Sequence, residues 1–466
     1  MEATRRILLE KLEGDLLTPI LVYQRMSGSK KFLLESSLKH EKSGRYSFIG
    51  ADPVMEVKGF GDRTMVISEK GEEWIQEKPL EILRSIMPNK MIKEDKNFPF
   101  FGGVVGYVGY DAIAQYEQIG MIPHDELDIP DVHLLFFEEV VVFDHYEQKV
   151  YVAATSFFSE THVPKLKVQL EKRKKEIING VGGNKTEPVS LSAFKTYIKK
   201  EEFIHKVKKA KEYIARGDIF QVVLSQRLQA TIKGDPFSFY RKLRVQNPSP
   251  YMYYLDFGSY QIAGASPESL IKVNEGRVTA NPIAGTRPRG KTDKEDQQLE
   301  LDLLSDEKEL AEHRMLLDLG RNDLGRVCEF GSIKIEKHMK IERYKHVMHL
   351  VSEISGNLRT GHSPLDALIS CLPAGTVSGA PKIKAMEIIY ELEEMKRGIY
   401  AGAVGYFSAN GNLDFALAIR TMIIKDNKAF IQAGAGIVHD SIPEKEYEET
   451  LHKLRAFLED QNDIAD

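Results

Sequence analysis

Short apolar runs broken by turn-forming residues fill the first 180 residues of this 466-residue chain. We predict β-strands in these runs, which include LTPILVYQRM, KFLLESS, GRYSFIGADP and PVMEVKGFG. A β-hairpin is expected to turn near His145–Gln148, and helical spacing predicts a helix around Val163–Ile178. The segment Gly180–Pro188 combines glycines with Asn and Pro, which makes it the best candidate for a linker.

Helical spacing begins again after this linker, at Phe203, Val207, Ala210 and Ile214, and Gly217 stands where a glycine commonly ends a helix. Further strands are expected at FQVVLSQRLQATI, YMYYLDFG, YQIAGAS, SLIKVN, GAVGYFS, LDFALAIRTMII and AFIQAGAGIV. Further helices are expected at Glu295–Leu304, Lys308–Val327, Leu365–Ser370, Pro381–Tyr390 and Pro443–Leu458.

Strands largely follow one another along the chain, with a few helices between them. This order favours an α+β fold with antiparallel sheets over a doubly wound parallel fold. We therefore expect a strand-rich N-terminal region at residues 1–180 and a second region at residues 189–466.

Composition excludes several classes of protein. The chain has 64 Lys and Arg against 69 Asp and Glu, a net charge of −5, which argues against broad electrostatic binding to nucleic acid. Apolar stretches stay shorter than the roughly 18 residues of a membrane-spanning helix. The two cysteines, Cys328 and Cys371, cannot form a disulfide framework or a four-cysteine zinc site, and they favour a reducing cytoplasm.

Two Glu-x-x-Glu pairs are the first candidates for chemistry: Glu309 with Glu312, and Glu446 with Glu449. On the predicted helices, this spacing places both carboxylates of each pair on one face. Two such faces brought together would make an oxygen-rich site suited to Mg²⁺. The alternative is structural, because Asp306 followed by Glu309 fits a capping box and acidic first turns are common.

Two glycine-containing segments and two single residues have both a functional and a structural interpretation. The small residues of QAGAGIVHD allow backbone N–H groups to approach an anion, or they form a plain turn. Arg287 and Arg289 in NPIAGTRPRG suit a carboxylate, or they lie in a solvated loop. His349 is either a core residue or a catalytic one. Arg420 ends the apolar run LDFALAIR, where a buried arginine needs an anionic partner from the protein or a ligand.

Taken together, these segments resemble the chorismate-utilising enzymes, and among them the anthranilate synthases. The resemblance covers nearly the whole chain and is densest from Asp218 to Thr450. The matching segments are GDIFQVVLSQR, NPSPYMYYL, GASPESL, NPIAGTRPRG, KELAEHRMLLDLGRNDLGR, VMHLVSEISG, AGTVSGAPK, YAGAVGYFS, AIRTMI and QAGAGIVHDSIPEKEYEET. The resemblance implies two large antiparallel β-sheets packed face to face, with helices on the outside and a chorismate-binding catalytic region at 189–466.

The resemblance also implies roles for individual residues. A Mg²⁺ ion would be held by Glu312 and Glu449, with Glu446 and Glu309 close by. Glu268 matches the family's general acid, and His349 matches the residue linked to the elimination of pyruvate. The positions expected to contact chorismate or to complete its pocket are Gly285, Thr286, Thr376, Tyr400, Arg420, Gly434, Ala435 and Gly436.

Two positions separate members of this family. Relatives that add water carry a lysine base where this chain has Gln221, and aminodeoxychorismate synthases carry a nucleophilic lysine where this chain has Ala284. Both differences favour direct attack of ammonia on chorismate, giving anthranilate and pyruvate through aminodeoxyisochorismate, the first committed step of tryptophan biosynthesis. The alternatives are an aminodeoxyisochorismate or aminodeoxychorismate synthase, and a non-catalytic subunit that senses tryptophan.

The N-terminal region carries a segment, LLES, that resembles one wall of a tryptophan pocket for feedback inhibition. The implied allosteric positions are Glu35, Ser36, Pro250, Tyr251 and Met252. Both cysteines lie within the synthase motifs and not in a glutaminase domain. The resemblance therefore implies that a separate glutamine amidotransferase subunit supplies the ammonia.

Overall fold

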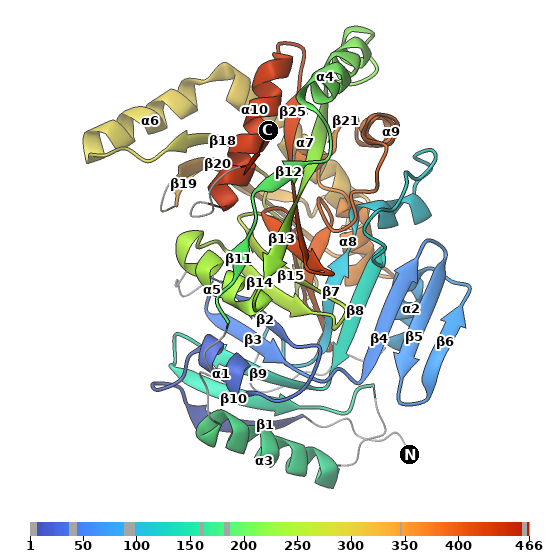
Figure 1. Ribbon diagram of the computed structural model, residues 1–466, viewed down its shortest axis with the longest axis vertical. Helices are drawn as coiled ribbons and strands as arrows, with labels where there is room; N and C mark the ends of the chain where they lie inside the picture. The colour runs from blue at the N-terminus through green and yellow to red at the C-terminus, as the bar shows by residue number, and fades with distance from the viewer. Residues whose placement is uncertain are drawn as a thin grey trace.

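The computed structural model describes residues 7–36, 44–87, 98–158, 163–180, 187–344, 347–458 and 464–465. Two large, mainly antiparallel sheets form the framework, and helices cover their outer faces (Figure 1). This arrangement confirms the α+β fold with two sheets that the sequence and the family resemblance predict.

Within the described residues, the first sheet has 14 strands and contains the ends of the chain. Its strands, in spatial order, are β1 (Leu8–Glu13), β10 (Lys149–Ala154), β9 (Glu139–Asp144), β3 (Tyr46–Gly50), β2 (Phe32–Glu35), β14 (Tyr251–Asp256), β15 (Tyr260–Ser266), β24 (Thr421–Lys425), β25 (Lys428–Ile437), β13 (Gln221–Lys233), β12 (Phe194–Thr196) and β26 (Ile464–Ala465). Two short strands, β11 (Ser190–Leu191) and β21 (Gly379–Ala380), also pair with β13.

The second sheet has 12 strands within the same residues. In spatial order they are β18 (Ile283–Pro288), β20 (Val347–Asn357), β17 (Arg277–Ala280), β16 (Ser269–Asn274), β23 (Leu413–Leu417), β22 (Ala403–Ser408), β7 (Gly103–Val108), β8 (Val132–Phe137), β4 (Met55–Phe60), β5 (Arg63–Ser68) and β6 (Gly71–Ile75), while β19 (Lys334–Arg343) pairs with β20. Each sheet therefore contains strands from both sides of the predicted linker. That linker falls mostly on residues 181–186, outside the described residues, and the boundary stays a prediction.

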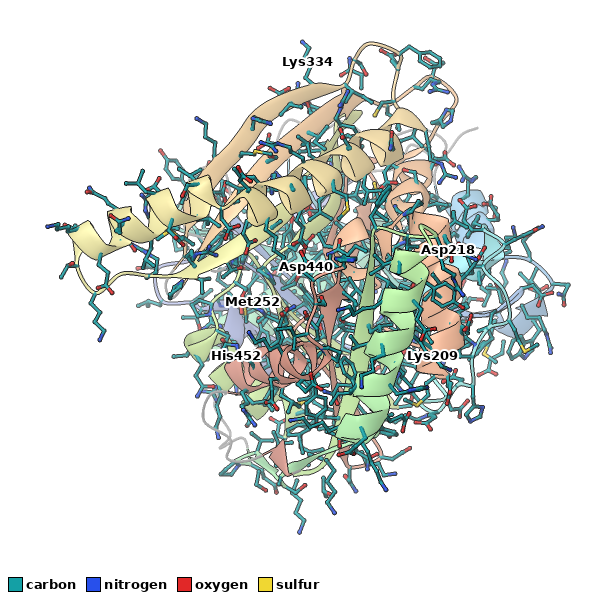
Figure 2. The ribbon with its side chains drawn as sticks, turned by 90° about the horizontal axis from the view of Figure 1, so that it is seen from above. Lys209, Asp218, Met252, Lys334, Asp440 and His452 are labelled. Atoms are coloured by element: carbon teal, nitrogen blue, oxygen red, sulfur yellow. The ribbon has the colours of Figure 1, made fainter. Side chains whose placement is uncertain are left out.

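Helices cover the two sheets from outside. They are α1 (Pro19–Arg25), α2 (Pro79–Ile86), α3 (Val163–Asn179), α4 (Lys200–Ala215), α5 (Pro236–Gln246), α6 (Asp293–Ser305), α7 (Glu307–Gly325), α8 (Pro364–Cys371), α9 (Lys382–Glu393) and α10 (Pro443–Phe457), with 3-10 turns η1 (Tyr110–Gln115) and η2 (Gly375–Val377). Helices α4, α9 and α10 pack on β13 and β25, and α7 packs on β18 and β20. Figure 2 shows α10, which carries His452, beside α4, which carries Lys209.

Most of the expected elements are present, but the strand predicted at LTPILVYQRM is wrong. Residues Pro19–Arg25 form α1, because the Thr18 hydroxyl accepts a hydrogen bond from Leu21 N at 3.1 Å and Pro19 occupies the first turn. Helices α2 and α5, which also begin with proline, were not expected from the apolar spacing.

The segment LDFALAIRTMII, expected as one strand, is two strands in different sheets. β23 belongs to the second sheet and β24 to the first, and Arg420 between them has a left-handed backbone with φ of 49°. The chain thus passes from one sheet to the other at Ala418–Arg420. This step places Arg420 between the two sheets.

Aromatic and apolar side chains fill the space between the sheets. Phe32 on β2 meets Phe137 on β8 with ring centroids 4.7 Å apart. A buried polar contact also joins the sheets, since the Tyr260 hydroxyl on β15 lies 2.6 Å from His133 Nδ1 and 2.8 Å from the Tyr107 hydroxyl. Burial lowers the pKa of His133 to about 4, so this ring is neutral at physiological pH. Among the described residues, no helix is long and apolar enough to cross a membrane.

We predict that the paired glycines of β7 and β22 are required for these two strands to pack within the second sheet. Gly106 and Gly405 face each other, and a Cβ at either position would lie 2.1 Å from a neighbouring carbonyl oxygen. Gly106→Ala or Gly405→Ala should therefore lower the free energy of unfolding by about 1–3 kcal/mol, measured by urea denaturation. Gly325→Ala in α7, whose Cβ would meet only Ile333 at 3.9 Å, is the control and should leave stability unchanged or higher. Equal stability of all three variants would contradict this account.

Candidate active site and effector cavity

A cavity of about 250 Å³ lies where the two sheets part beneath α7 and α10. The first sheet contributes β13, β24 and β25, and the second contributes β18 and β20. The lining residues are Val223, Pro267, Glu268, Ile283, Ala284, Thr286, Glu312, Leu316, His349, Thr376, Val377, Tyr400, Ile419, Arg420, Thr421, Ile431, Gln432, Ala433, Gly434, Lys453 and Leu454. Eight of the sequence-predicted positions are in this wall: Glu268, Thr286, Glu312, His349, Thr376, Tyr400, Arg420 and Gly434. Gln221, Gly285, Glu309, Ala435, Gly436, Glu446 and Glu449 are not wall residues, although several of them contact it.

Arg420 presents a cation to this cavity. Within the described part of the chain, its guanidinium has no hydrogen-bond or ion-pair partner, and the surrounding protein lowers its pKa by displacing water. Its left-handed backbone follows directly from the passage between the sheets, and strain of this kind is common at binding sites. Arg420 and the neighbouring Tyr400 therefore form one end of the cavity that is suited to a carboxylate.

Glu268 lies in a nearly dry position. Its carboxyl group accepts a hydrogen bond from Thr376 Oγ1 at 2.9 Å, and it lines both the main cavity and a second cavity of about 50 Å³ behind it. Burial raises its pKa from 4.5 to about 7, and the Thr376 hydrogen bond offsets only part of this shift. A carboxyl group that keeps its proton to about pH 7 is able to protonate a leaving group.

His349 is fixed in one tautomer. Its Nδ1 lies 3.2 Å from the Gly285 carbonyl oxygen and 3.0 Å from Thr286 Oγ1. A carbonyl oxygen only accepts, so Nδ1 carries the hydrogen and the neutral ring has its lone pair on Nε2. Gly285 provides this contact from a bulge between β18 and β20, where its φ is 70°. Burial lowers the pKa of His349, which keeps the ring neutral and able to accept a proton.

The two carboxylate pairs lie on the first two turns of α7 and α10. Burial, followed by the charge of Glu312, raises the pKa of Glu309, and burial is also the main cause of the raised pKa of Glu446. Gln221 Nε2 donates to Glu312 Oε1 at 3.0 Å, while Gln221 Oε1 is buried without a partner among the described residues. Within those residues, no three His, Cys, Asp or Glu side chains already surround a common point. Arg287 lies 3.5 Å from Glu309 and Lys453 lies 2.8 Å from Glu449, so part of the negative charge is balanced. The four carboxylates nevertheless supply oxygen ligands of the kind that a divalent cation prefers.

Asp306 is the N-cap of α7, as the structural interpretation expects, although the contacts of this helix do not include the reciprocal Glu309 bond of a capping box. The Asp306 carboxylate caps α7 by accepting from Lys308 N and Glu309 N, at 3.0 and 3.2 Å. Arg287 pairs with Asp306 and Asp302, and Arg289 pairs with Asp296. These two arginines are satisfied by protein carboxylates, so they stiffen the loop and do not face a ligand.

Lys453 is a cavity residue that sequence reasoning missed. Its ammonium group donates to the Gly434 carbonyl at 2.9 Å and pairs with Glu449 at 2.8 Å. It stands four residues after Glu449 on α10, one helical turn further along the same face. This spacing is the sequence feature that could have identified Lys453. Lys453 joins the carboxylate pair of α10 to β25. Gly434, Ala435 and Gly436 are part of this strand and pair with β13, so the turn expected there from the sequence is wrong.

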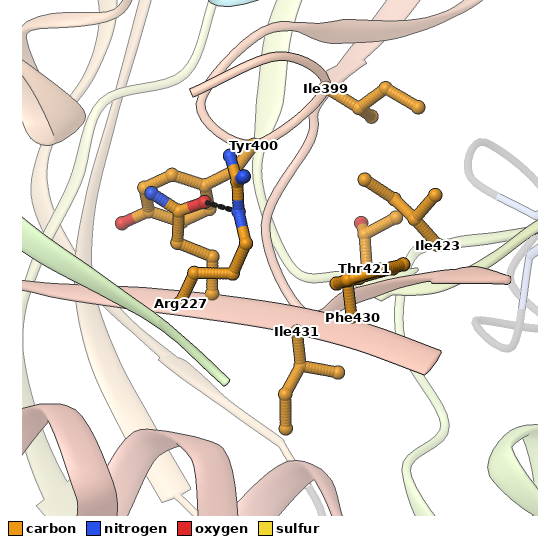
Figure 3. A pocket seen from close by; sticks show the side chains of 8 residues that line it. Arg227, Ile399, Tyr400, Thr421, Ile423, Phe430 and Ile431 are labelled. Carbon is orange, nitrogen blue, oxygen red and sulfur yellow. Dashed lines mark hydrogen bonds between the residues drawn. The ribbon is translucent and has the colours of Figure 1, made fainter. Parts of the chain in front are cut away.

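A further small cavity of about 10 Å³, enough for one water-sized molecule, adjoins the main one behind Tyr400 (Figure 3). It is shared by Tyr400, Thr421, Ile431 and Gln432, which also line the main cavity. Arg227 closes it, with Nε donating to Gln432 Oε1 at 3.1 Å, while its Nη1 is buried without a partner among the described residues. The buried polar side chains of Arg227 and Gln432 therefore form part of the wall behind Tyr400.

A separate cavity of about 350 Å³ brings together all five predicted allosteric positions: Glu35, Ser36, Pro250, Tyr251 and Met252. Glu35 is not free there, because its carboxylate accepts from Arg244 at 3.0 and 3.1 Å and from the Tyr240 hydroxyl at 2.7 Å. The Tyr251 hydroxyl donates to Asp414 at 2.9 Å. The cavity thus offers aromatic walls and both signs of charge, since Lys272 lines it beside Asp414.

Comparison with known proteins agrees with this geometry. The family model of chorismate binding enzymes matches residues 30–459, and the chain belongs to that family. It is 49% identical to the anthranilate synthase component 1 of Acetivibrio thermocellus over 463 residues, with 96% of this chain and 93% of the relative covered. It is 44% identical to that of Lactococcus lactis, with 97% and 98% covered.

Among solved structures, anthranilate synthase component I from Streptococcus pneumoniae matches with a TM-score of 0.82 and 44% identity, over 98% of this chain and 100% of that one. The menaquinone-specific isochorismate synthase of Escherichia coli shares the fold at 20% identity, with a TM-score of 0.74 and 98% and 95% of the two chains covered.

We predict that Glu268 destabilises the folded chain at neutral and alkaline pH. Its folded pKa of about 7 lies above the unfolded value of 4.5, so the folded state holds the proton more tightly and stability falls as pH rises from 4.5 to 7. Because a glutamine side chain does not titrate, Glu268→Gln should become more stable than the wild type over this range, by up to roughly 3 kcal/mol above pH 7. Urea denaturation at pH 5 and pH 8 measures this difference.

Glu336→Gln is the control for this experiment, because hydrogen bonding to Ser355 lowers the pKa of Glu336. Its effect should have the opposite sign and be small, since the group is exposed. A stability difference for Glu268→Gln that is the same at both pH values would contradict the assigned protonation of Glu268.

Proposed function

We infer that the chain converts chorismate and ammonia into anthranilate and pyruvate, as the large component of an anthranilate synthase. The observation that carries this inference is the cavity between the sheets. It combines Glu268, His349 and Arg420 in a chain whose relatives over nearly its whole length are named anthranilate synthase component 1. The reaction is a lyase reaction at the start of tryptophan biosynthesis.

Chorismate carries two carboxylates, and we propose that two different parts of the cavity wall bind them. Arg420 and Tyr400 suit the enolpyruvyl carboxylate, because the guanidinium has no protein partner among the described residues. The strand segment Gly434–Gly436 of β25, next to Lys453, suits the ring carboxylate. Residues with a side chain do not fit at Gly434 and Gly436. A Cβ at Gly434 would lie 2.9 Å from the Tyr400 hydroxyl, and a Cβ at Gly436 would lie 2.7 Å from Gln221 Nε2.

We propose that a Mg²⁺ ion is held by Glu312 and Glu449, with Glu309 and Glu446 beside them. The raised pKa values of Glu309 and Glu446 support this assignment, because each carboxylate is partly buried and stands beside a second one, Glu312 or Glu449. The bound cation would neutralise the ring carboxylate of chorismate.

The first stage is the replacement of the C4 hydroxyl by ammonia at C2. Ammonia forms a bond to C2, both ring double bonds shift by one position, and the C4–O bond breaks, so that the hydroxyl leaves as water with the proton of Glu268. Gln221 has no basic lone pair to deprotonate water, and Ala284 in the cavity wall offers no nucleophile. Both residues favour ammonia as the direct nucleophile.

The second stage forms the aromatic ring. The C2 proton leaves, its bonding electrons form a ring double bond, and the C3–O bond breaks to release pyruvate. His349 Nε2, which holds a lone pair beside the cavity, is the base we propose for this proton. Ammonia would come from a glutamine amidotransferase partner, and the free, buried thiols of Cys328 and Cys371 are consistent with a cytoplasmic location.

The activity assay is direct. The purified chain, incubated with chorismate, ammonium and Mg²⁺ at mildly alkaline pH, should give anthranilate fluorescence, and chelation of Mg²⁺ should abolish it. Glu449→Gln should raise the Mg²⁺ concentration needed for half-maximal rate by at least tenfold, because one anionic ligand is lost. The exposed Glu448→Gln on the same helix is the control and should keep the wild-type dependence. A different amino product by mass would instead identify an aminodeoxyisochorismate or aminodeoxychorismate synthase.

We also propose that tryptophan inhibits the enzyme from the 350 Å³ cavity. Ser36→Leu would fill part of this space, so it should raise the tryptophan concentration for half-inhibition by more than tenfold, with kcat and KM for chorismate within about twofold of wild type. Ser68→Leu, on β5 outside the cavity, is the control. Inhibition that is purely competitive with chorismate, or unchanged in Ser36→Leu, would place the effector elsewhere.

A further inference from the structure

Arg397 is the largest fully buried side chain in the described residues, with 1% of its surface exposed. It lies in the turn that follows α9, just before Tyr400 and β22. None of the roles proposed above uses it. A buried guanidinium is costly unless it is paired and hydrogen-bonded, so its contacts reveal what it holds in place.

The charge of Arg397 is balanced by Glu393, the last residue of α9. Arg397 Nε donates to Glu393 Oε2 at 2.8 Å, and Nη2 donates to Oε1 at 2.6 Å, which is a bidentate pair. Glu393 Oε1 also accepts from the backbone N and the hydroxyl of Ser225, at 2.7 and 2.9 Å. The pair therefore joins the end of α9 to the central strand β13.

The remaining donors of Arg397 reach the back of the cavity wall. Nη1 donates to the Val377 carbonyl and Nη2 donates to the Val223 carbonyl, each at 2.7 Å. Val377 and Val223 both line the main cavity, from η2 and β13 respectively. Val377 directly follows Thr376, the hydrogen-bond donor to Glu268.

The flat face of the guanidinium supports two aromatic rings. Its central carbon lies 5.6 Å from the ring centroid of Tyr400 and 4.6 Å from that of Tyr110. Tyr400 lines the main cavity, whereas Tyr110 is part of the surrounding core. One side chain thus contacts three separate wall residues from behind: Val223, Val377 and Tyr400.

We propose that Arg397 is a positioning residue that fixes the end of the cavity where the enolpyruvyl group of chorismate binds, chiefly by holding Tyr400. This inference rests on the proposed substrate. Only a planar, five-donor group can bind a carboxylate and two carbonyls while stacking on rings, so lysine cannot replace arginine here. Loss of this support leaves the cavity present but loosely defined, and small displacements of this kind reduce rates strongly.

The two stages of the reaction depend on Tyr400 unequally. The first stage changes bonds at C2 and C4 of the ring. The second breaks the C3–O bond and releases the enolpyruvyl group itself. A poorly held enolpyruvyl group should therefore slow the second stage more than the first, and the amino intermediate should escape from the cavity before pyruvate is lost.

A double-mutant cycle tests this inference. The variants are Arg397→Lys, Tyr400→Phe and the double variant, assayed with ammonium for KM, kcat and the ratio of released aminodeoxyisochorismate to anthranilate. Arg397→Lys should raise KM for chorismate about tenfold and increase the share of released intermediate. In the Tyr400→Phe background the same substitution should change KM by less than about twofold. Arg397 acts on KM through the contact of Tyr400 with the enolpyruvyl group, and loss of the Tyr400 hydroxyl already weakens that contact.

Two further variants separate positioning from general stability. Arg173→Lys is the matched control: Arg173 is also buried and paired with Glu139 and Glu176, but its contacts are far from the cavity wall in the sequence and in the fold. It should lower the unfolding temperature without changing KM or the product ratio. Glu393→Gln keeps the volume of the carboxylate but weakens the pair, so it gives a second test if Arg397→Lys does not fold.

Equal effects of Arg397→Lys in both backgrounds would overturn the inference, and so would wild-type KM and product ratio in folded Arg397→Lys or Glu393→Gln. The wild-type chain in the same assay tests the proposed function separately. If it made a different amino product from chorismate, the assigned reaction would be wrong. In that case the double-mutant cycle, measured as KM for chorismate, would still test whether Arg397 positions Tyr400.

Discussion

The passage of the chain from the second sheet to the first, at Ala418–Arg420, is the constraint on which the site depends. β23 ends in one sheet and β24 begins in the other, so the connecting residues must lie between the sheets. Arg420 takes a left-handed backbone there. Side chains from both sheets then reach one space, because the sheets separate at this crossing and α7 and α10 cover the opening.

A cavity between two sheets requires polar groups inside an apolar core, and the chain handles them in two ways. Arg397 and Glu393 are fully paired and support the wall from behind. Glu268 and Arg420 are left largely unpaired and face the cavity. Paired groups give rigidity, whereas unpaired groups keep the perturbed protonation and free hydrogen-bonding capacity that a reaction needs.

Much of this organisation was visible in the sequence. Helical spacing located α4, α7 and α10, and the two glutamate pairs fell on the expected helices. The segment that became α1 was misread, since its apolar and β-branched residues resemble a strand and the Thr18–Pro19 start signal was overlooked. The break before Arg420 carries no local signal, because the sequence continues apolar and only tertiary pairing divides it between two sheets.

The same limit explains the residues that were missed. Lys453 stands four residues after Glu449, and Arg397 stands four residues after Glu393. That spacing indicates the pair of Arg397 with Glu393 but not its other contacts, which are carbonyls of β13 and η2. Backbone acceptors are identical at every position, so a sequence cannot show which carbonyl a buried arginine will bind. The family resemblance supplied the residues that we propose to contact substrate, and the structure supplied those that support them.

The interleaving of the two sheets also governs how the chain can be made. During synthesis, β2 cannot pair until β14 has been made, and β7 cannot pair with β22 until most of the chain has emerged from the ribosome. Neither sheet can close around its core before then. Apolar strand edges of the early segments stay unpaired during translation, and such edges are prone to aggregation. Protection by chaperones and a low synthesis temperature should therefore determine the yield of folded enzyme more than the equilibrium stability of the finished chain.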